Sequence, residues 1–321
     1  MRFEIMKQYY VINRRDCGSI CSYMLDELYR REDVCTVFQS KLPSHRNRWL
    51  RKLLHIADRM QWELRKSLLI RKLSSVIKKG QHPAVLITNE SMLWLQPRDV
   101  EKLRAKGVTT VALLIDPISA PYDTAQCAKQ LLEQTTFDRV LTFDPRDAEE
   151  NGWTYTNTLY SQFAVEPAPI TNDLFYMGNI KDRLAMCKLL LQRMNQHGVT
   201  GMIKLGCNAD AAKQLPAQVL LKKYLSYPQM LQQLQSTKCI LDITQQGQSG
   251  VTLRYYEAVV FNKKLLTNNR NIAQLPFYDP RYMKFYDTVD DIDWQWVKSD
   301  DMPDYQYDGR FSPVRLLDLL S

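Results

Sequence analysis

The chain has 321 residues, of which 45% are hydrophobic and 24% charged, so it can bury the cores of two ordinary domains and is not globally disordered. No stretch approaches the ~20 apolar residues of a membrane span, and the charged N-terminal residues lack a signal-peptide pattern. Seven cysteines, an odd number spread over a long chain, indicate free thiols rather than a disulfide framework. We therefore expect a cytoplasmic protein.

The formal net charge of +8 is concentrated in one segment. Residues 44–79 contain eleven Lys or Arg against Asp58 and Glu63, a net charge of +9, which leaves about −1 for the rest of the chain. The protein is therefore nearly neutral outside one basic segment, and that segment needs its own explanation.

The first half of the chain alternates apolar strands with helical stretches, the pattern of βαβ units and a parallel sheet. Strands are expected at 4–13, 34–39, 84–88, 109–116 and 139–142, and helices at 19–31, 48–78, 97–106 and 124–134. The polar, proline-bearing stretch 155–172 has no clear period and indicates a linker between domains.

A second series of the same kind follows the linker. Strands are expected at 174–177, 201–205, 239–243 and 264–267, and helices at 182–197, 227–237, 252–262 and 314–320. The sequence thus predicts an α/β protein with two doubly wound domains, 1–165 and 166–321, whose final helix, about 313–321, can pack back on the first domain. Sheets of this type bind ligands at the carboxyl ends of their strands.

The loop that follows the predicted strand 239–243 is suited to phosphate. Gly250 lets the backbone approach a ligand, Ser249 and Thr252 offer hydroxyls, and the following helix directs free N–H groups at an anion. Glu257, about one and a half turns into that helix, can reach a sugar diol. The alternative is an ordinary glycine loop and a solvated glutamate.

A second candidate lies where strand 174–177 runs into a turn with Gly178 and Asn179. Lys181 and Arg183 open the next helix, where cations oppose the helix dipole unless an anion is bound. The alternative is that Asp182 satisfies the dipole and both cations lie on the surface.

Three stretches together carry a family resemblance: the run 142–148, the turn 178–183 and the loop and helix start 248–258. They resemble the bacterial glycosyltransferases of lipopolysaccharide, capsule and exopolysaccharide assembly, which have the GT-B architecture of two facing Rossmann-like domains. The resemblance implies an acceptor bound by the N-terminal domain and a sugar-nucleotide donor held by the C-terminal domain. Tyr255 and Tyr256 depart from the smaller or aliphatic residues expected there.

Carried over position by position, the resemblance implies that Glu257 holds the donor ribose and that the loop before it faces the diphosphate. Positive charge would come from Lys181 or Arg183. The donor-binding candidates are Gly178, Asn179, Lys181, Arg183, Gln248, Ser249, Gly250, Val251, Thr252 and Glu257.

Candidates for the general base that deprotonates an acceptor follow strands of the first domain. Asp116 is preferred because it closes a buried strand, and Asp16 and Glu90 follow two others. Each could equally be a helix N-cap or a loop carboxylate.

The sequence indicates no metal site and no cofactor other than the donor substrate, most simply a UDP-sugar. The four histidines lack metal-ligand spacing, and the literal Asp291-Ile292-Asp293 string lies in an acidic stretch without a preceding apolar strand.

Within the basic segment, Trp49, Leu53, Ile56, Met60, Leu64 and Leu68 recur at helical spacing. A basic amphipathic helix suits an anionic membrane surface, with contacts expected from Arg48, Arg51, Lys52 and Arg59. The alternative is a helix that covers the sheet with its apolar face.

These features predict a metal-independent glycosyltransferase of surface-polysaccharide synthesis. It would transfer a sugar from a nucleotide diphosphate to a lipid-linked or oligosaccharide acceptor at the inner face of the cytoplasmic membrane. Two other classes stay open: a nucleic-acid-binding protein that uses the basic segment, and a non-catalytic scaffold that binds nucleotide.

Overall fold

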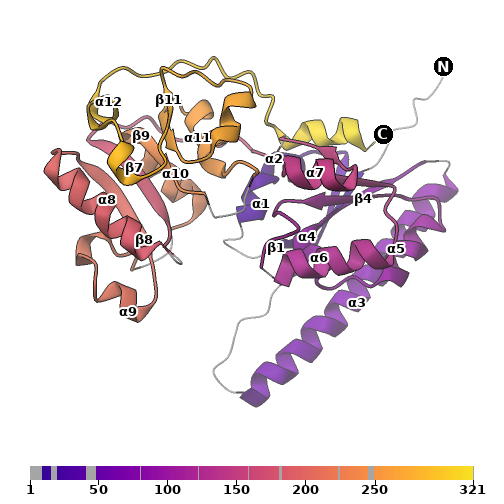
Figure 1. Ribbon diagram of the computed structural model, residues 1–321. Helices are drawn as coiled ribbons and strands as arrows, with labels where there is room; N and C mark the ends of the chain where they lie inside the picture. The colour runs from indigo at the N-terminus through magenta and orange to yellow at the C-terminus, as the bar shows by residue number, and fades with distance from the viewer. Residues whose placement is uncertain are drawn as a thin grey trace. The chain divides into compact units, whose positions relative to one another are not determined.

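The computed structural model describes residues 9–15, 20–40, 48–79, 81–121, 123–157, 159–180, 183–222, 225–244 and 249–320. The chain forms two compact units, each described by itself (Figure 1). Unit 1 comprises residues 1–161 and 310–321, and unit 2 comprises residues 162–309.

Unit 1 is built on a parallel sheet of six strands in the order β2-β1-β3-β4-β5-β6. Its central strands are continuous runs of Val, Leu and Ile, as expected where both faces of a sheet are covered. The strands are β1 Tyr9–Arg15, β2 Val34–Ser40, β3 Ala84–Thr88, β4 Thr109–Leu114, β5 Arg139–Thr142 and β6 Thr154–Tyr155.

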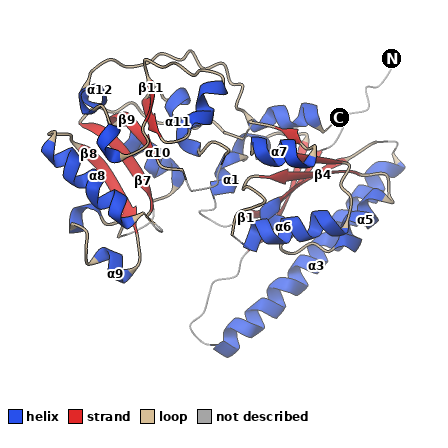
Figure 2. Ribbon diagram, viewed as in Figure 1, coloured by secondary structure: helices blue, strands red, loops and turns tan. Residues whose placement is uncertain are grey.

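Helices cover both faces of this sheet (Figure 2). Successive residues of each strand point to opposite faces, so they pack against different helices. Tyr10 and Ile12 pack among α3, α5 and α6, whereas Val11 packs among α2 and the C-terminal helix η4. The helices of unit 1 are α1 Ile20–Met24, α2 Asp26–Tyr29, α3 Arg48–Lys78, α4 Asn89–Met92, α5 Pro97–Arg104, α6 Asp123–Gln134, α7 Pro145–Asn151 and the 3-10 helix η4 Pro313–Leu319.

Unit 2 is built on a parallel sheet of five strands in the order β11-β10-β9-β7-β8. The strands are β7 Asn172–Asn179, β8 Gly201–Gly206, β9 Thr237–Asp242, β10 Lys264–Thr267 and β11 Met283–Phe285. Its helices are α8 Leu184–Gln196, α9 Ala209–Ala212, α10 Tyr227–Gln235, α11 Leu253–Val260 and α12 Trp294–Lys298, with 3-10 helices η1 Ala217–Val219, η2 Arg270–Gln274 and η3 Val289–Asp291.

The two sheets share one topology. In each, the first strand pairs with both the second and the third, and the later strands extend the sheet on the side of the third. The prediction of two doubly wound α/β domains is therefore confirmed. The strand order reverses between β1 and β3 in unit 1 and between β7 and β9 in unit 2, since the second strand lies on one side of the first and the third on the other. Such switch points are where open α/β sheets bind ligands.

The unit boundaries differ in detail from the predicted 165–166 division. The chain first passes from unit 1 to unit 2 between Ser161 and Gln162. Ser161 still belongs to unit 1, because its Oγ donates to the Met24 carbonyl at 2.8 Å and accepts from the Glu27 N–H at 2.9 Å. The C-terminal segment belongs to unit 1, where Leu316 and Leu320 are buried against the sheet.

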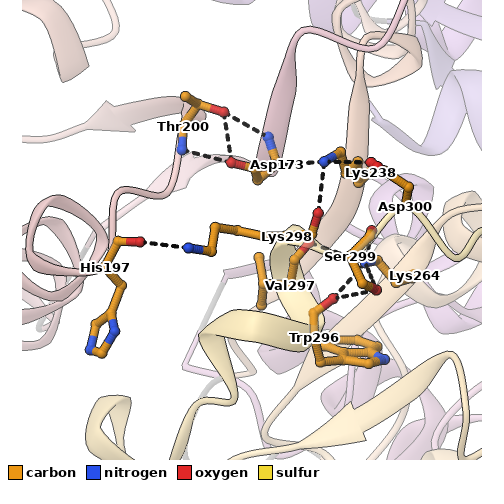
Figure 3. A network of polar contacts seen from close by, with 10 residues as sticks. All are labelled: Asp173, His197, Thr200, Lys238, Lys264, Trp296, Val297, Lys298, Ser299 and Asp300. Carbon is orange, nitrogen blue, oxygen red and sulfur yellow. Dashed lines mark hydrogen bonds and ion pairs between the residues drawn. The ribbon is translucent and has the colours of Figure 1, made fainter.

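Lysines at the amino ends of β9 and β10 hold the end of α12 in unit 2 (Figure 3). Lys264 Nζ, on a fully buried side chain, donates to the carbonyls of Trp296, Val297 and Ser299 at 2.6 to 3.1 Å, so it satisfies the end of α12. Lys238 pairs with Asp173 at 3.0 Å. These contacts lie at the opposite end of the sheet from its switch point.

Candidate functional site

The switch point of unit 2 lies between the carboxyl ends of β7 and β9. Arg183, at the N-cap of α8, joins these ends, since its guanidinium donates to the carbonyls of Asn179 at 2.8 Å and Ile243 at 2.7 Å. The sequence predicts a diphosphate contact for Arg183. In the structure each of its three nitrogens donates to a backbone carbonyl, so it stabilises the edge on which a ligand would rest.

The loop before α11 is held against the end of β10 by two asparagines. Asn269 Nδ2 donates to the Gly250 carbonyl at 3.2 Å, and Asn271 Nδ2 donates to the Ser249 carbonyl at 2.9 Å. Val251 is buried. The backbone of the described part of the loop, residues 249–252, is thus held in place by the protein itself, which is the condition for a preorganised anion site.

Thr252 is the N-cap of α11, where its Oγ1 accepts from the Arg254 N–H at 3.1 Å. The same hydroxyl donates to the buried carboxylate of Asp242 at 2.7 Å, and Thr267 donates to the other oxygen at 2.8 Å. Burial raises the pKa of Asp242 against these two hydrogen bonds. The Thr252 hydroxyl, expected to face a diphosphate, is therefore used inside the protein.

Arg254 carries positive charge into the first turn of α11. Its guanidinium lies over the Phe175 ring at 5.4 Å, donates to the Met177 carbonyl at 2.8 Å and pairs with Glu257. Burial opposes the charged form, but Glu257, Tyr227 and Tyr176 together outweigh it and the pKa of Arg254 is raised. The side chain stays 15% exposed, so part of it is accessible at the carboxyl end of β7.

Glu257, the partner of Arg254 in this ion pair, is fully buried. Its carboxylate accepts from the Tyr227 hydroxyl at 2.8 Å and from Arg254. The resemblance implies a ribose contact for Glu257, but in this arrangement a ribose reaches the carboxylate only if Tyr227 or Arg254 moves aside. The contacts present give Glu257 the role of holding Arg254 in place.

The remaining predicted donor residues are spread over this edge. Gly178 lies on β7, where a Cβ atom would come within 3.1 Å of the Tyr176 hydroxyl, and Asn179 is exposed at the strand end. Lys181 and Gln248 lie outside the described residues. The sequence prediction does not include Arg254, although Arg254, like Lys181 and Arg183, is a cation at the start of a helix. It does not include Asp242, Asn269 and Asn271 either.

The switch point of unit 1 is lined by uncharged polar groups. Asn13, fully buried on β1, accepts a hydrogen bond from Thr88 Oγ1 at 2.8 Å, and Ser91 Oγ donates to the Ile12 carbonyl at 3.0 Å. These bonds join the ends of β1 and β3 and give unit 1 a rigid polar edge.

Asp116 lies two residues beyond β4 on the same edge and is half-buried. Asn89 holds it: the amide Nδ2 donates to Asp116 Oδ2 at 3.1 Å, while Oδ1 accepts from the Ile115 N–H at 3.3 Å. Asn89 is itself only 1% exposed. Glu90 is half-buried in the first turn of α4, and Asp16 lies outside the described residues.

Among the described residues, no group of three or more His, Cys, Asp or Glu side chains could hold a metal ion. Asp291 accepts from the Thr288 N–H and hydroxyl, and Asp293 caps α12 and pairs with Lys284 at 2.8 Å. These bonds hold the pKa of both carboxyls below the ordinary value. Both have local structural roles.

No family model and no curated protein matches the sequence. Among solved structures, the chain is similar to T4 phage β-glucosyltransferase at 11% identity, covering 98% of this chain and 94% of that one, with a TM-score of 0.48. It is similar to OtsA at 12% identity with the same coverages and TM-score. A UDP-glucosyltransferase from Polygonum tinctorium matches at 10% identity over 84% of this chain and 83% of that one, with a TM-score of 0.43.

With TM-scores below 0.5, these similarities carry no argument about what the chain binds or does.

Proposed function

We propose that the protein is a glycosyltransferase that takes its sugar from a nucleoside-diphosphate donor. The observation that carries the proposal is Arg254, a cation fixed at the helix start beside the switch point of unit 2 and still partly exposed. A sugar nucleotide presents a diphosphate, which such a site would bind through Arg254 and the N–H groups that begin α11.

The same groups would assist the reaction. When the glycosidic bond to the diphosphate breaks, negative charge grows on the leaving oxygen. Fixed donors aimed at that oxygen stabilise the charge without having to reorganise. Arg254 is fixed in this sense, because Glu257, Met177 and the Phe175 ring hold its guanidinium. This supports a metal-independent reaction.

The polar edge of unit 1 would supply the group that activates the acceptor. Asp116 is the proposed general base, which takes the proton from an acceptor hydroxyl as the new glycosidic bond forms. Asn89 would keep its carboxylate in one orientation through the 3.1 Å hydrogen bond. In this proposal unit 2 would supply the anion site for the leaving group and unit 1 the base for the acceptor.

We propose a UDP-sugar as donor and a lipid-linked or oligosaccharide acceptor of surface-polysaccharide synthesis, at the inner face of the cytoplasmic membrane. The support is the sequence resemblance of the segments 142–148, 178–183 and 248–258 to enzymes of that class. Segment 142–148 contains β5's last residue and most of α7, where Asp144 caps the helix by accepting from the Arg146 and Asp147 N–H groups.

Calorimetric titration with UDP, uridine and a panel of UDP-sugars tests the donor site. We expect UDP to bind more tightly than uridine, and Arg254→Gln to remove most of this difference, about 10- to 100-fold in affinity for a charge-assisted contact. Arg281→Gln is the matched control, since Arg281 is exposed and paired with Asp279. Equal affinity for UDP and uridine in the wild type would overturn the proposal.

Turnover distinguishes an enzyme from a scaffold. The wild type is expected to release UDP from its cognate UDP-sugar, slowly to water and faster with an acceptor. Nucleotide binding without any release across the panel would support the non-catalytic alternative.

A further inference from the structure

Helix α3 carries two apolar stripes on opposite sides. One is buried against the sheet of unit 1 and contains Trp62, Leu69, Leu73 and Val76. The other, which we call the outer stripe, consists of four residues spaced by four and exposed to solvent: Ile56 (57%), Met60 (69%), Leu64 (61%) and Leu68 (54%). At about 100° per residue, the centres of the two stripes lie roughly opposite each other.

The outer stripe is not ordinary surface. Among the described residues, the other large hydrophobic side chains that are exposed are Tyr155 (37%) and Ile170 (43%), each on a different element of the chain. Single exposed apolar residues need no explanation, but a contiguous patch marks a binding surface. The stripe runs ~18 Å along the helix.

The buried side of α3 fixes the direction in which the outer stripe faces. Lys66 Nζ pairs with Asp99 at 3.0 Å on α5, and the Trp62 indole N–H donates to the Trp94 carbonyl at 3.2 Å. Figure 1 shows the first turns of α3 extending beyond the other labelled elements of unit 1. The stripe therefore lies on an anchored helix and faces away from the core.

Charge identifies the partner. Arg59, Arg71 and Lys78 are exposed on the same helix, and the segment 44–79 carries a net charge of +9. Arg59 lies to one side of the outer stripe, and Arg71 continues the stripe beyond Leu68. Lys66 is excluded from this set, since it is buried with Asp99. The side chains of Arg48, Arg51 and Lys52 lie outside the described ones.

We infer that the outer stripe of α3 is a docking surface for an anionic lipid membrane, on which the helix lies parallel to the surface. Aliphatic side chains would enter the boundary between headgroups and acyl chains while the arginines contact lipid phosphate. This deepens the proposed function, because it names the surface where a lipid-linked acceptor would be met.

Other occupants fit the stripe less well. A second copy of α3 would bring two strongly basic helices together, and like charges at close range are unfavourable. A nucleic acid would use the arginines but leave four aliphatic side chains in water, since its recognition depends on phosphate contacts and stacking. A lipid surface uses both the charge and the apolar stripe.

Vesicle flotation with the full chain tests the inference. The wild type is expected to float with vesicles containing phosphatidylglycerol and not with neutral phosphatidylcholine vesicles. Leu64→Ser and Leu68→Ser together should lower the partition coefficient at least tenfold. Arg59→Gln and Arg71→Gln should each lower it about fivefold and reduce its sensitivity to salt.

Matched controls separate docking from folding. Ile170→Ser removes an apolar side chain of comparable exposure from unit 2, and Lys188→Gln removes an exposed cation there; neither should change flotation. The stripe variants should keep the wild-type unfolding temperature and UDP affinity, because the altered side chains are exposed.

Flotation does not depend on sugar transfer or on UDP binding. A protein that binds UDP but does not float would contradict the membrane inference alone, and one that floats but does not bind UDP would contradict the proposed function alone. The inference is overturned if the stripe variants float as well as the wild type, if neutral vesicles recover as much protein as anionic ones, or if light scattering shows a dimer that Leu64→Ser dissociates. Salt-sensitive DNA binding that the stripe variants do not weaken, without flotation, would instead assign the segment to nucleic acid.

Discussion

Glu257 and Arg254 form an ion pair across one turn of α11 in which the Glu257 side chain is fully buried and the Arg254 side chain is 15% exposed. The exposed member of the pair can meet a ligand, whereas the buried member determines where the exposed one lies. Because a third residue, Tyr227, also donates to the carboxylate, the pair is joined to α10 as well.

Changing Glu257 should therefore affect both binding and stability. Glu257→Ala leaves the largely buried Arg254 without its partner, so we expect a loss of about 3–5 kcal/mol in the free energy of unfolding in addition to weaker UDP binding. Denaturant titration and calorimetry measure the two effects. Glu166→Gln, the removal of an exposed carboxylate in the same unit, is the control and should change neither.

Glu257→Gln tests the positioning role more gently, since the amide can still accept from Tyr227. Affinity for UDP should fall while affinity for uridine changes little, because Glu257 acts by positioning Arg254, which would contact the diphosphate and not the nucleoside. If uridine binding falls equally, Glu257 contacts the ribose as the resemblance implies.

Arg183→Gln should destabilise unit 2 by about 1–3 kcal/mol, because backbone carbonyls at the ends of β7 and β9 lose charge-assisted donors. The preference for UDP over uridine should be reduced less than by Arg254→Gln. Thermal unfolding with and without UDP measures both. A stable variant that has lost only its diphosphate affinity would show that Arg183 contacts the ligand directly.

The sequence predicts the sheets well and the site residues only in part. Strands 84–88, 139–142 and 264–267 and helix 48–78 have the predicted bounds, because each has a clear apolar period or a buried run. The predicted helix 19–31 is instead α1 and α2, interrupted at Leu25. Its apolar spacing does not reveal the break.

Within the site, sequence spacing locates the loop 249–252 but not the partners of its side chains. Thr252 bonds to Asp242, and Asn269 reaches Gly250 from beyond the next strand. Such contacts depend on which strands are neighbours, and strand order cannot be read from local periodicity. For the same reason, the apolar spacing of α3 does not tell which of its two stripes faces the sheet.

Asn89→Ala should lower kcat for transfer by about 10- to 100-fold, with a smaller effect on KM for the donor, since it frees the Asp116 carboxylate to rotate. Asp116→Asn should lower kcat by about 10²- to 10⁴-fold. Steady-state kinetics with UDP release give both values. If Asn89→Ala lowers kcat but Asp116→Asn does not, the base lies elsewhere, and Glu90→Gln is the next variant to test.

Chelation should leave activity unchanged, because the proposed charge stabilisation comes from Arg254 and helix N–H groups. Transfer is measured in EDTA and again after addition of Mg²⁺ or Mn²⁺. If EDTA abolishes transfer and Mn²⁺ restores it, a metal ion takes part and Asp291→Asn and Asp293→Asn would be examined first.

Acid should destabilise unit 2 through Asp173. Burial opposes ionisation, but hydrogen bonds from the Thr200 N–H at 2.9 Å and hydroxyl at 2.8 Å, together with Lys238, outweigh it, so the pKa of Asp173 lies below its ordinary value of 3.8 (Figure 3). A carboxyl whose pKa is lowered by folding contributes stability above its unfolded pKa and loses it as pH falls through the folded value. Asp173→Asn should therefore cost roughly 1–3 kcal/mol at pH 7 and reduce the loss of stability between about pH 4 and pH 2. Denaturant titrations of both proteins across this range measure the difference.

Because Asp210→Asn alters a carboxylate that is 87% exposed, it should keep the wild-type acid profile. Parallel profiles for wild type and Asp173→Asn would mean that other carboxylates cause the acid sensitivity, and the contacts of Asp173 with Thr200 and Lys238 would then contribute little to stability in either protonation state.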